Sequence, residues 1–508
     1  MNNQKSSIQM LTQCRFYQQL LIIFIVSIAS PAIAQSGPPI NRMDYHFSWD
    51  GQSTILAMDI VYHDHDQDST VFVFGNPQAG GQARIFDILG NVKTENGDTF
   101  EIIKGQRKIV VHHKSSGIKI LHAEIDGKLI PDAKRARVNE AFRTTITKGF
   151  FYTMGYQLFM NLADTSYNQI GIKWDHWPKD MPYLISSNPE AKPDELQVIS
   201  SEGSARNEII IQMSSDLMVA KRKLNGIPHY LITSKSDSSS GVPRQLERFM
   251  ETYMPAIREF WNDRKAPFFL LSAIPLLNEL PSTITGMAVP NGMSIRYRGP
   301  LEKDKLRIVA HEVSHNWIGI NLKLAQNGME NNWFNEGFND YIAIYNLVKT
   351  GLYSKAEFLD YVNGENLAAH YSSPVGQVPG DSIESNFFKN RLYERLPYHR
   401  GFIFAFYLDN QLRLASEGKK TIRDFLRALN AHSNPKGARV LTTPEFVSVL
   451  RTFLPDTDLN AEIKRYLLSG QYLDFRKIKL VKGLRIHYEQ QVPVLEISDQ
   501  VNVQQIYK

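Results

Sequence analysis

The chain has 508 residues, of which 43% are hydrophobic and 21% are charged, and its formal net charge is +5. This composition is typical of a folded protein with about two to four domains, and it excludes an intrinsically disordered chain. The charge is too mild for a nucleic-acid-binding protein, and the sequence has no basic run with interleaved aromatic residues.

The N-terminal residues 1–34 predict a secretory signal peptide. Lys5 and Arg15 supply positive charge, residues 20–29 are apolar, and residues 32–34 form the small-x-small cleavage site Ala-Ile-Ala. The apolar stretch is too short to cross a bilayer comfortably, so we expect cleavage rather than an uncleaved anchor. We therefore expect an exported protein, periplasmic or secreted, without a stable membrane span.

A β-rich domain is predicted for residues 35–235. Short runs of β-branched and aromatic residues lie at 55–62, 70–74 and 208–212, and each is bounded by Gly, Asp, Asn or Ser. They predict a β-sandwich-like domain. The polar, serine-rich residues 236–241 predict the boundary that follows it.

The rest of the chain reads as mixed α/β and then as mainly helical. Apolar spacing predicts a helix at 242–261, a continuous apolar run predicts a strand at 268–274, and a further helix is expected to begin near Leu306. Helical patterns then dominate residues 381–475, and residues 476–508 form a C-terminal extension. The fold class predicted for the whole chain is multidomain α+β.

Residues 311–315 read His-Glu-Val-Ser-His and fall on the helix that begins near Leu306. Two imidazoles four residues apart lie on one helical face, where they can bind one metal ion. Glu312 lies about 100° round the helix, where it can reach a metal-bound water. Two histidines and one carboxylate leave the fourth coordination position of the metal open, which is typical of catalytic Zn²⁺. The alternative for His311 and His315 is a pair of surface or hydrogen-bonded core histidines.

Two acidic residues after this motif complete the predicted site. Glu336, on the next predicted helix, is the expected third metal ligand, while Glu330 is a rival without helical context. Asp340 follows Glu336 by four residues on the same helical face. It is expected to accept a hydrogen bond from the free ring nitrogen of a ligand histidine, which fixes the tautomer. The alternative for Asp340 is an ordinary solvated carboxylate.

The motif at 311–315, with Asn-Glu-Gly-Phe at 335–338, resembles the gluzincin metallopeptidases. These include thermolysin, the aminopeptidase N and leukotriene A4 hydrolase family, and the glycyl aminopeptidase family. Residues 398–402, Tyr-His-Arg-Gly-Phe, resemble a segment of the aminopeptidase branches and, with the apolar residues that follow, are most similar to the glycyl aminopeptidase branch. The resemblance implies a thermolysin-like zinc catalytic domain at 242–380. It also implies that Tyr398 donates a hydrogen bond to the tetrahedral oxyanion.

One departure from the family pattern concerns substrate binding. Gly286, Met287, Ala288 and Val289 occupy the place of the Gly-Ala-Met-Glu-Asn strand of aminopeptidase N relatives. The resemblance therefore implies that these residues lie along the substrate, with Val289 where the family's glutamate binds the free amine. An apolar side chain at that position cannot neutralise an ammonium group.

Two further departures concern the chain around the site. Twenty residues separate His315 from Glu336, which is more than in aminopeptidase N relatives, so the connecting loop is expected to have its own shape. The PDZ domain that usually ends glycyl aminopeptidase relatives is not predicted here, because the C-terminal extension is too short.

The predicted function is hydrolysis of peptide bonds by a zinc-activated water, with Glu312 as the base and an aminopeptidase as the favoured type. Val289 leaves open a metalloendopeptidase without a free-amine requirement. A non-catalytic zinc-binding protein is a further alternative. Loss of Glu312 or Tyr398 would indicate such a protein, but this sequence retains both residues. The last alternative is a metalloenzyme that acts on an epoxide or an ester instead of a peptide. The expected partner is a peptide or protein substrate, and the oligomeric state is left open.

Two other clusters are predicted to be structural. The His-Asp-His-Asp run at 63–66 is expected to form a solvated hairpin loop, because it joins two predicted strands. The lysines within residues 302–307 are expected to be a solvated helix start.

Overall fold

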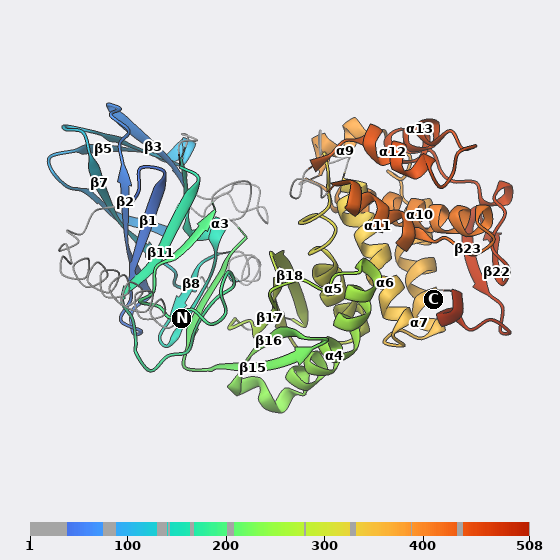
Figure 1. Ribbon diagram of the computed structural model, residues 1–508, viewed down its shortest axis with the longest axis horizontal. Coiled ribbons are helices and arrows are strands. Elements are labelled where there is room, and N and C mark those ends of the chain that lie inside the picture. The colour runs from blue at the N-terminus through green and yellow to red at the C-terminus, as the bar shows by residue number, and fades with distance from the viewer. Residues whose placement is uncertain are drawn as a thin grey trace, which may run out of the picture.

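The computed structural model describes residues 38–74, 88–129, 140, 143–162, 167–200, 208–278, 281–325, 332–387, 389–433 and 440–506. The predicted signal peptide and Glu330 lie outside these residues. Figure 1 shows a β-rich N-terminal part, coloured blue to green, beside a C-terminal part that is mostly helical. The multidomain, mixed α/β architecture expected from the sequence is therefore present.

Three sheets make up the described N-terminal part. One has the order β13-β11-β1-β2-β7-β4, the second β10-β3-β6-β5 and the third β12-β14-β9-β8. The strands are β1 (Arg42–Ser48), β2 (Ile55–His63), β3 (Ser69–Phe74), β4 (Leu89–Thr94), β5 (Thr99–Ile103), β6 (Lys108–His112), β7 (Ile118–Asp126), β8 (Thr145–Thr147), β9 (Phe150–Met154), β10 (Met160–Leu162), β11 (Gln169–His176), β12 (Tyr183–Ile185), β13 (Gln197–Ser200) and β14 (Ile210–Ser214). The short helix α3 (Gly155–Leu158) follows β9.

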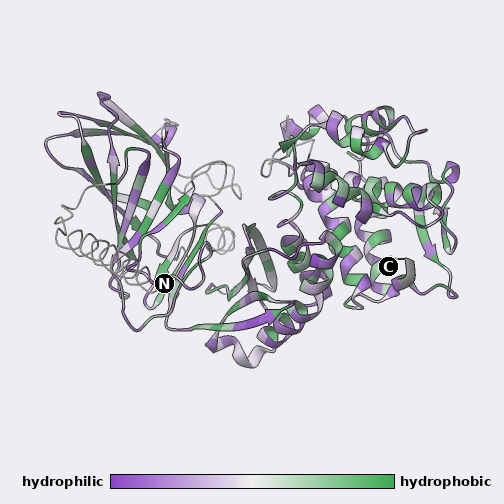
Figure 2. Cartoon of the chain, in the orientation of Figure 1, coloured by the Kyte–Doolittle hydropathy of each residue, from purple (hydrophilic) through white to green (hydrophobic). Residues whose placement is uncertain are grey.

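The strands form because their side chains alternate between two environments. In β2, Leu56, Met58 and Ile60 are fully buried, whereas the residues between them are half-buried or exposed. Successive side chains of a strand point to opposite faces, so this alternation directs one face of the sheet into the core. The same alternation of hydrophobic and hydrophilic residues is visible along the N-terminal strands in Figure 2.

The loop between β2 and β3 differs from the solvated hairpin predicted for residues 63–66. Asp64 is only 3% exposed. Its carboxylate accepts hydrogen bonds from the backbone N–H groups of Asp66 and Gly117, and it lies 3.9 Å from the Lys119 ammonium group. The prediction failed because the partners of Asp64 come from β7 and the turn before it, far along the chain.

A five-stranded sheet, in the order β15-β16-β17-β19-β18, begins the second part of the molecule. Its strands are β15 (Leu217–Leu224), β16 (Ile227–Ser234), β17 (Phe269–Pro275), β18 (Thr283–Val289) and β19 (Gly292–Arg298). The domain boundary predicted at residue 235 is therefore too late, because β15 and β16 pair with the strands that follow it. Strand β18 lies at the sheet edge, and helix α4 (Val242–Trp261) packs against this sheet region.

Helices cover most of the remaining chain. They are α5 (Lys303–Ser314), η6 (Trp333–Phe338), α6 (Asn339–Lys349), α7 (Lys355–Asp360), η7 (Tyr361–Ala368), α8 (Ala369–Tyr371), α9 (Gly380–Asn386), α10 (Arg391–Ala415), α11 (Ile422–Ser433), α12 (Thr443–Arg451), α13 (Leu459–Glu462), η8 (Ile463–Leu468) and α14 (Val503–Ile506). Two short strands, β20 (Lys323–Leu324) and β21 (Val440–Leu441), pair in parallel, and β22 (Leu484–Glu489) and β23 (Val492–Ile497) form a hairpin. None of the described helices is both long and apolar enough to cross a bilayer.

A single hydrophobic core joins this second part from β16 to α14. It runs from Leu231 through the α5 and α10 helices to Val503. The separate segments predicted at 381–475 and 476–508 therefore share one core with the zinc-motif region. Lys305, expected in a solvated helix start, is 4% exposed, and its ammonium group donates to the carbonyl of Pro300 at 2.6 Å.

Buried polar contacts join the β-rich part to the five-stranded sheet. Arg296 of β19 donates to Glu140 at 2.6 Å, and both side chains are almost fully buried. Glu140 also accepts a backbone hydrogen bond from Asn278 at 2.9 Å, and Tyr152 of β9 bonds Ser294 at 3.0 Å. Burying an ion pair requires such extra hydrogen bonds. They fix the sheet that borders the candidate site against the N-terminal part.

Candidate active site

Helix α5 carries the predicted metal motif at its C-terminal end. Val309, Ala310 and Val313 form its fully buried stripe. His311 is buried beside this stripe, and His315 caps the helix and is half-buried. The two histidines therefore leave the helix on the side that faces a cavity rather than the core.

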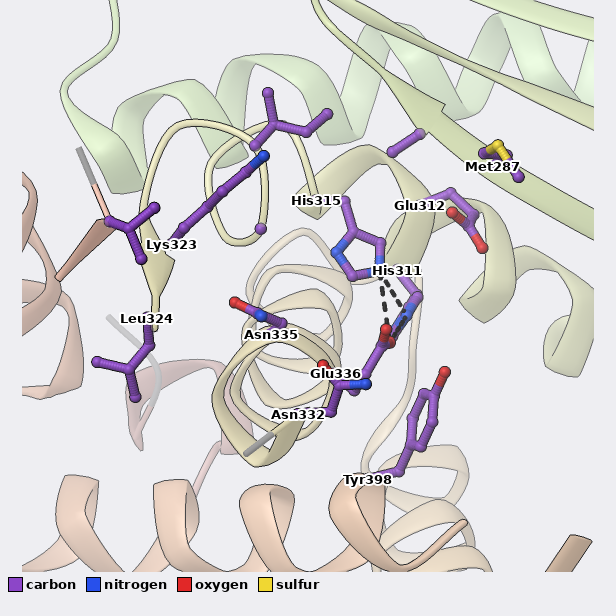
Figure 3. Close-up of a pocket in the computed structure, with 14 residues that line it drawn as sticks. Met287, His311, Glu312, His315, Lys323, Leu324, Asn332, Asn335, Glu336 and Tyr398 are labelled. Atoms are coloured by element: carbon purple, nitrogen blue, oxygen red, sulfur yellow. Dashed lines mark hydrogen bonds and ion pairs between the residues drawn. The ribbon is translucent and has the colours of Figure 1, made fainter. Parts of the chain in front are cut away.

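Three potential ligand atoms converge in front of α5 (Figure 3). The Nε2 atoms of His311 and His315 lie 3.0 Å apart, and Oε2 of Glu336 lies 3.2 Å from the first and 3.5 Å from the second. Ligands bound to a tetrahedral ion at about 2.05 Å lie about 3.3 Å from one another. The triangle thus has the size of one face of a zinc site. The structure brings together the three ligands that the sequence predicted.

The outer ring nitrogens of both histidines are held by acceptors. Nδ1 of His311 lies 3.1 Å from Oδ1 of Asp340, and Nδ1 of His315 lies 3.1 Å from the carbonyl of Ile318. Because a carboxylate and a carbonyl only accept, each Nδ1 carries the proton and each Nε2 presents a lone pair to the centre. Asp340 therefore has the position that the sequence predicted for it.

Asp340 is itself fixed by three donors. Besides His311, it accepts from Arg307 at 2.8 Å and from the hydroxyl of Tyr361. Burial alone would raise its pKa, but the Arg307 charge and the bond from His311 hold the pKa of Asp340 well below its usual range. It is only 1% exposed, so it is a buried anion whose negative charge stays beside the ligand histidine.

The charges at the centre favour a cation. Burial disfavours a charged His311, but the carboxylates of Asp340 and Glu336 raise its pKa to about 10. Burial would likewise raise the pKa of Glu336, but His315 and His311 hold it well below its usual range. The site therefore retains a proton when no metal replaces it. A divalent cation must displace that proton, so metal affinity is expected to rise with pH.

Glu312 lies against the edge strand β18. A Cβ placed on Gly286 would approach the Cγ of Glu312 to 2.5 Å, so a larger residue at this position would force the Glu312 side chain to shift. Burial raises the pKa of Glu312, although the nearby histidines and a backbone hydrogen bond from Ala288 lower it in part. A carboxylate with a raised pKa beside a metal position can accept a proton and return it.

Tyr398 reaches the same cavity from α10. Its ring stacks 5.9 Å from the ring of His311, and the guanidinium carbon of Arg395 lies 4.6 Å from its centre. Burial and the charge of Glu336 raise the pKa of Tyr398 well above its ordinary value. The hydroxyl therefore stays protonated and can donate a hydrogen bond. Figure 3 shows Tyr398 and Glu312 flanking the three ligand atoms.

A cavity of about 520 Å³ is lined by the three potential metal ligands and by Glu312 and Tyr398. Of the four residues expected to bind substrate, Met287 and Ala288 line it and Gly286 faces Glu312. Val289 does not line it. It is fully buried against residues such as Tyr152 of the N-terminal part. The position predicted for a substrate-amine contact is thus wrong, because Val289 at the end of β18 packs into a buried cluster with residues of the N-terminal part.

The opposite wall of the cavity was not expected from the sequence. Its described members are Gly319, Ile320, Lys323, Leu324, Asn332, Asn335 and Val440. Strand pairing between β20 and β21 brings residues 323 and 440 side by side. A two-residue strand has no periodicity to read, so the sequence could not have placed the residues of β20 and β21 in this wall, although Asn335 belongs to the Asn-Glu-Gly-Phe motif.

Comparison with known proteins places the site in a wider context. Residues 300–443 match the family model of the peptidase family M1 domain. Leucine aminopeptidase 2-2 of Meyerozyma guilliermondii is 26% identical to this chain over 223 residues, which are 37% of this chain and 34% of that protein. The match thus spans about a third of the relative's length.

Two solved structures share the fold over most of the chain. An aminopeptidase N family protein from Idiomarina loihiensis aligns with a TM-score of 0.68 and 13% identity, covering 88% of this chain and 79% of that one. Native leukotriene A4 hydrolase from Saccharomyces cerevisiae aligns with a TM-score of 0.55 and 14% identity, covering 89% and 72%. At such identities the likeness establishes a shared fold.

Proposed function

We propose that the chain is a zinc-dependent aminopeptidase, because residues 300–443 match the model of the peptidase family M1 domain, in agreement with the resemblance to gluzincin aminopeptidases. One observation carries the proposal. The three potential ligand atoms, the half-buried carboxylate of Glu312 and the hydroxyl-bearing Tyr398 all line one cavity. The closer likeness to the glycyl aminopeptidase branch and the thermolysin-like catalytic domain stay predictions.

The residues present fit a zinc ion. His311, His315 and Glu336 would hold it through Nε2, Nε2 and a carboxylate oxygen, the two-histidine, one-glutamate set of hydrolytic zinc sites. When bound, zinc supplies Lewis acidity that polarises a water molecule and the scissile carbonyl. Asp340 and the Ile318 carbonyl keep both imidazoles in the orientation that this requires.

Two side chains of this chain would move protons and stabilise charge. Glu312 takes the proton of the attacking water onto its carboxylate and passes it to the nitrogen of the leaving amine. Tyr398 donates a hydrogen bond to the oxygen of the tetrahedral intermediate, an interaction that can be worth about 3 kcal/mol. Both side chains are preorganised, since Glu312 is held by β18 and Tyr398 by α10.

The edge strand β18 is the proposed platform for the peptide backbone. It pairs only with β19 among the described strands, so its other edge is available to an extended chain. Added-strand binding supplies backbone hydrogen bonds without regard to side-chain sequence. Met287 and Ala288 would then contact substrate where the strand meets the cavity.

The choice between an exopeptidase and an endopeptidase rests on opposing observations. The aminopeptidase names among the relatives favour removal of N-terminal residues. The only carboxylates among the described lining residues are Glu312 and Glu336, and both are assigned to the chemistry. No carboxylate among the described lining residues is therefore left to bind the free amine of a substrate. This favours the second candidate, a metalloendopeptidase without a free-amine requirement. Export through the signal peptide of residues 1–34 is part of the proposal.

The test uses the zinc-loaded mature chain and a pool of peptides with free or acetylated N-termini, with cut sites read by mass spectrometry. Release of single residues only from free N-termini is expected for the aminopeptidase. Internal cuts in acetylated peptides would replace it with the endopeptidase. Glu312→Gln is the control, and it should bind zinc normally while losing about three orders of magnitude in turnover. A zinc-loaded chain that cuts nothing would be a binding protein, and the proposal would fail.

A further inference from the structure

Lys323 is a cation on the cavity wall that faces the proposed metal site. It is the single lysine or arginine among the described lining residues. Figure 3 shows it beside Leu324, on the far side of the three ligand atoms from Met287. The proposed mechanism assigns it no role, since Glu312 and Tyr398 account for proton transfer and charge stabilisation.

No described residue neutralises the Lys323 ammonium group, although the side chain is half-buried. Several other sheltered lysines among the described residues have polar partners. Lys119 lies 3.1 Å from Asp98, Lys349 lies 3.3 Å from Glu259, and Lys305 donates to Pro300. Partial removal of a charge from water is unfavourable unless an opposite charge or hydrogen bonds compensate. Among the described residues the Lys323 ammonium group has no counter-charge, and it is available to an anion that enters the cavity.

Backbone hydrogen bonds hold the short segment that connects the ligand His315 to Lys323 of β20. His315 bonds the carbonyl of Ile318 at 3.1 Å, and the N–H of Ile320 donates to the carbonyl of His315 at 3.1 Å. The N–H of Ala325 donates to Leu441 at 2.6 Å, next to the β20–β21 pair. The lysine thus has a defined position relative to His315, as a residue that positions substrate needs.

The surroundings of Lys323 combine apolar walls with amide groups. Ile320, Leu324 and Val440 line the cavity next to it, and Asn335 adds a side-chain amide whose buried Oδ1 has no partner among the described residues. The Oδ1 of Asn335 is an acceptor, so only its NH2 group can donate a hydrogen bond to an anion. Together with the Lys323 ammonium group, the apolar wall suits a short aliphatic stem that ends in an anion. In a peptide, that group is a carboxylate.

We propose that Lys323 binds a carboxylate of the substrate, either the C-terminal carboxylate of a short peptide or the side chain of Asp or Glu. The inference rests on the proposed peptidase function and narrows its substrate class. It makes Lys323 a specificity residue. Substrates with a carboxylate that reaches Lys323 are expected to have a lower KM, with kcat little changed, because uniform binding affects KM alone.

The experiment compares matched substrates with the zinc-loaded chain and its Lys323→Gln and Lys323→Arg variants. Leu-Ala-Ala and its C-terminal amide test the terminal carboxylate, whereas the amides of Leu-Glu-Ala and Leu-Gln-Ala test the side chain. We expect about a tenfold preference in kcat/KM for the charged member of one pair. Lys323→Gln should reduce that preference to less than about twofold while leaving kcat for the neutral amides unchanged. Lys323→Arg, which keeps the positive charge, should retain most of the preference for the charged substrate.

A binding measurement separates failure of this inference from failure of the proposed function. Calorimetric titration of the same peptide pairs into Glu312→Gln, with and without Lys323→Gln, needs no turnover. If no peptide is cut but the charged peptide still binds better through Lys323, the carboxylate site stands and the peptidase proposal fails. Equal affinities for charged and neutral peptides in both backgrounds would overturn the Lys323 inference. A preference that Lys323→Gln leaves intact would overturn it as well.

Discussion

Two buried clusters of this molecule have nearly the same chemistry and different uses. In the N-terminal part, Nδ1 of His113 lies 3.1 Å from Asp98, which also pairs with Lys119. In the candidate site, Nδ1 of His311 lies 3.1 Å from Asp340, which pairs with Arg307. Each cluster therefore holds a histidine by a buried aspartate that a cation neutralises.

The clusters differ in what the second ring nitrogen faces. Nε2 of His113 lies 2.9 Å from the hydroxyl of Thr70, a neutral partner that satisfies it. Nε2 of His311 instead faces His315 and Glu336, two groups that present lone pairs. An aspartate orients a histidine equally well in both places. Only a second set of electron-pair donors, open to a cavity, turns an oriented histidine into a metal ligand.

The largest expected effect compares two tyrosines that lie near these histidines. Tyr398→Phe removes the oxyanion donor, and we expect kcat to fall by about 10² to 10³-fold with zinc content unchanged. Tyr62 lies 6.1 Å from the His113 ring, and its buried hydroxyl has no partner among the described residues. Tyr62→Phe should leave kcat unchanged and the melting temperature equal or higher. Steady-state kinetics and thermal unfolding of both variants decide this, and a Tyr398→Phe enzyme with normal kcat would remove the assigned role.

The second comparison breaks the aspartate in each cluster. Asp340→Asn should lower zinc affinity by about 10 to 100-fold, because the ligand histidine loses its anionic partner. Asp98→Asn should leave zinc affinity unchanged. It should lower the free energy of unfolding by about 3 kcal/mol, because Lys119 loses its nearest buried counter-charge. Competitive zinc titration and chemical denaturation measure the two effects, and equal zinc affinities in the two variants would contradict the comparison.

A third pair of variants adds one methyl group to an edge strand in each part. In Gly286→Ala the new Cβ would meet Glu312 at 2.5 Å and displace the base, so we expect kcat to fall by up to about 10²-fold. A Cβ added at Gly90 of β4 would have no neighbouring atom within 4 Å. Gly90→Ala should therefore keep full activity. Parallel assays of both variants, with zinc content as a check, test whether the tight approach at β18 matters for function.

The smallest effect is on pH dependence. Burial raises the pKa of Glu312, and the base must be ionised to accept a proton. As the pH decreases, kcat/KM should therefore fall with an apparent pKa above 4.5. Burial would also raise the pKa of Asp98, but hydrogen bonds from Lys114, His113 and Lys119 lower it overall. The ionised Asp98 carboxylate stabilises the folded state fully at pH values above 3.8, its ordinary pKa. This stabilisation is lost only as the pH falls through the lower pKa that Asp98 has in the folded chain. Activity should therefore disappear before the N-terminal cluster weakens.

Kinetics, bound zinc and circular dichroism recorded over the same pH series test this order of events. Bound zinc is included because protonation of the ligand histidines would also end activity at low pH. Activity that persists below pH 4.5 with zinc retained would show that Glu312 is not the base, or that its pKa is not raised.

The sequence by itself determined the parts of the site that depend on local spacing. His311, Glu312 and His315 lie within about one and a half helical turns, and Glu336 and Asp340 lie about one turn apart. Once these segments are helical, His311 and His315 must lie on one face with Glu312 about 100° away, and Asp340 must lie on the same face as Glu336. The β-rich N-terminal part and the helical C-terminal part followed in the same way, because alternation and helical periodicity are properties of neighbouring residues.

Only the tertiary structure decided which residues meet from distant segments. It placed β15 and β16 in the second part, buried Val289 against Tyr152, and paired Lys323 with Val440 from a distant part of the chain. It also enclosed Asp64 beside Lys119, where a solvated loop was expected. These contacts depend on which surfaces the folded chain brings together, and neither pattern nor composition encodes that choice locally.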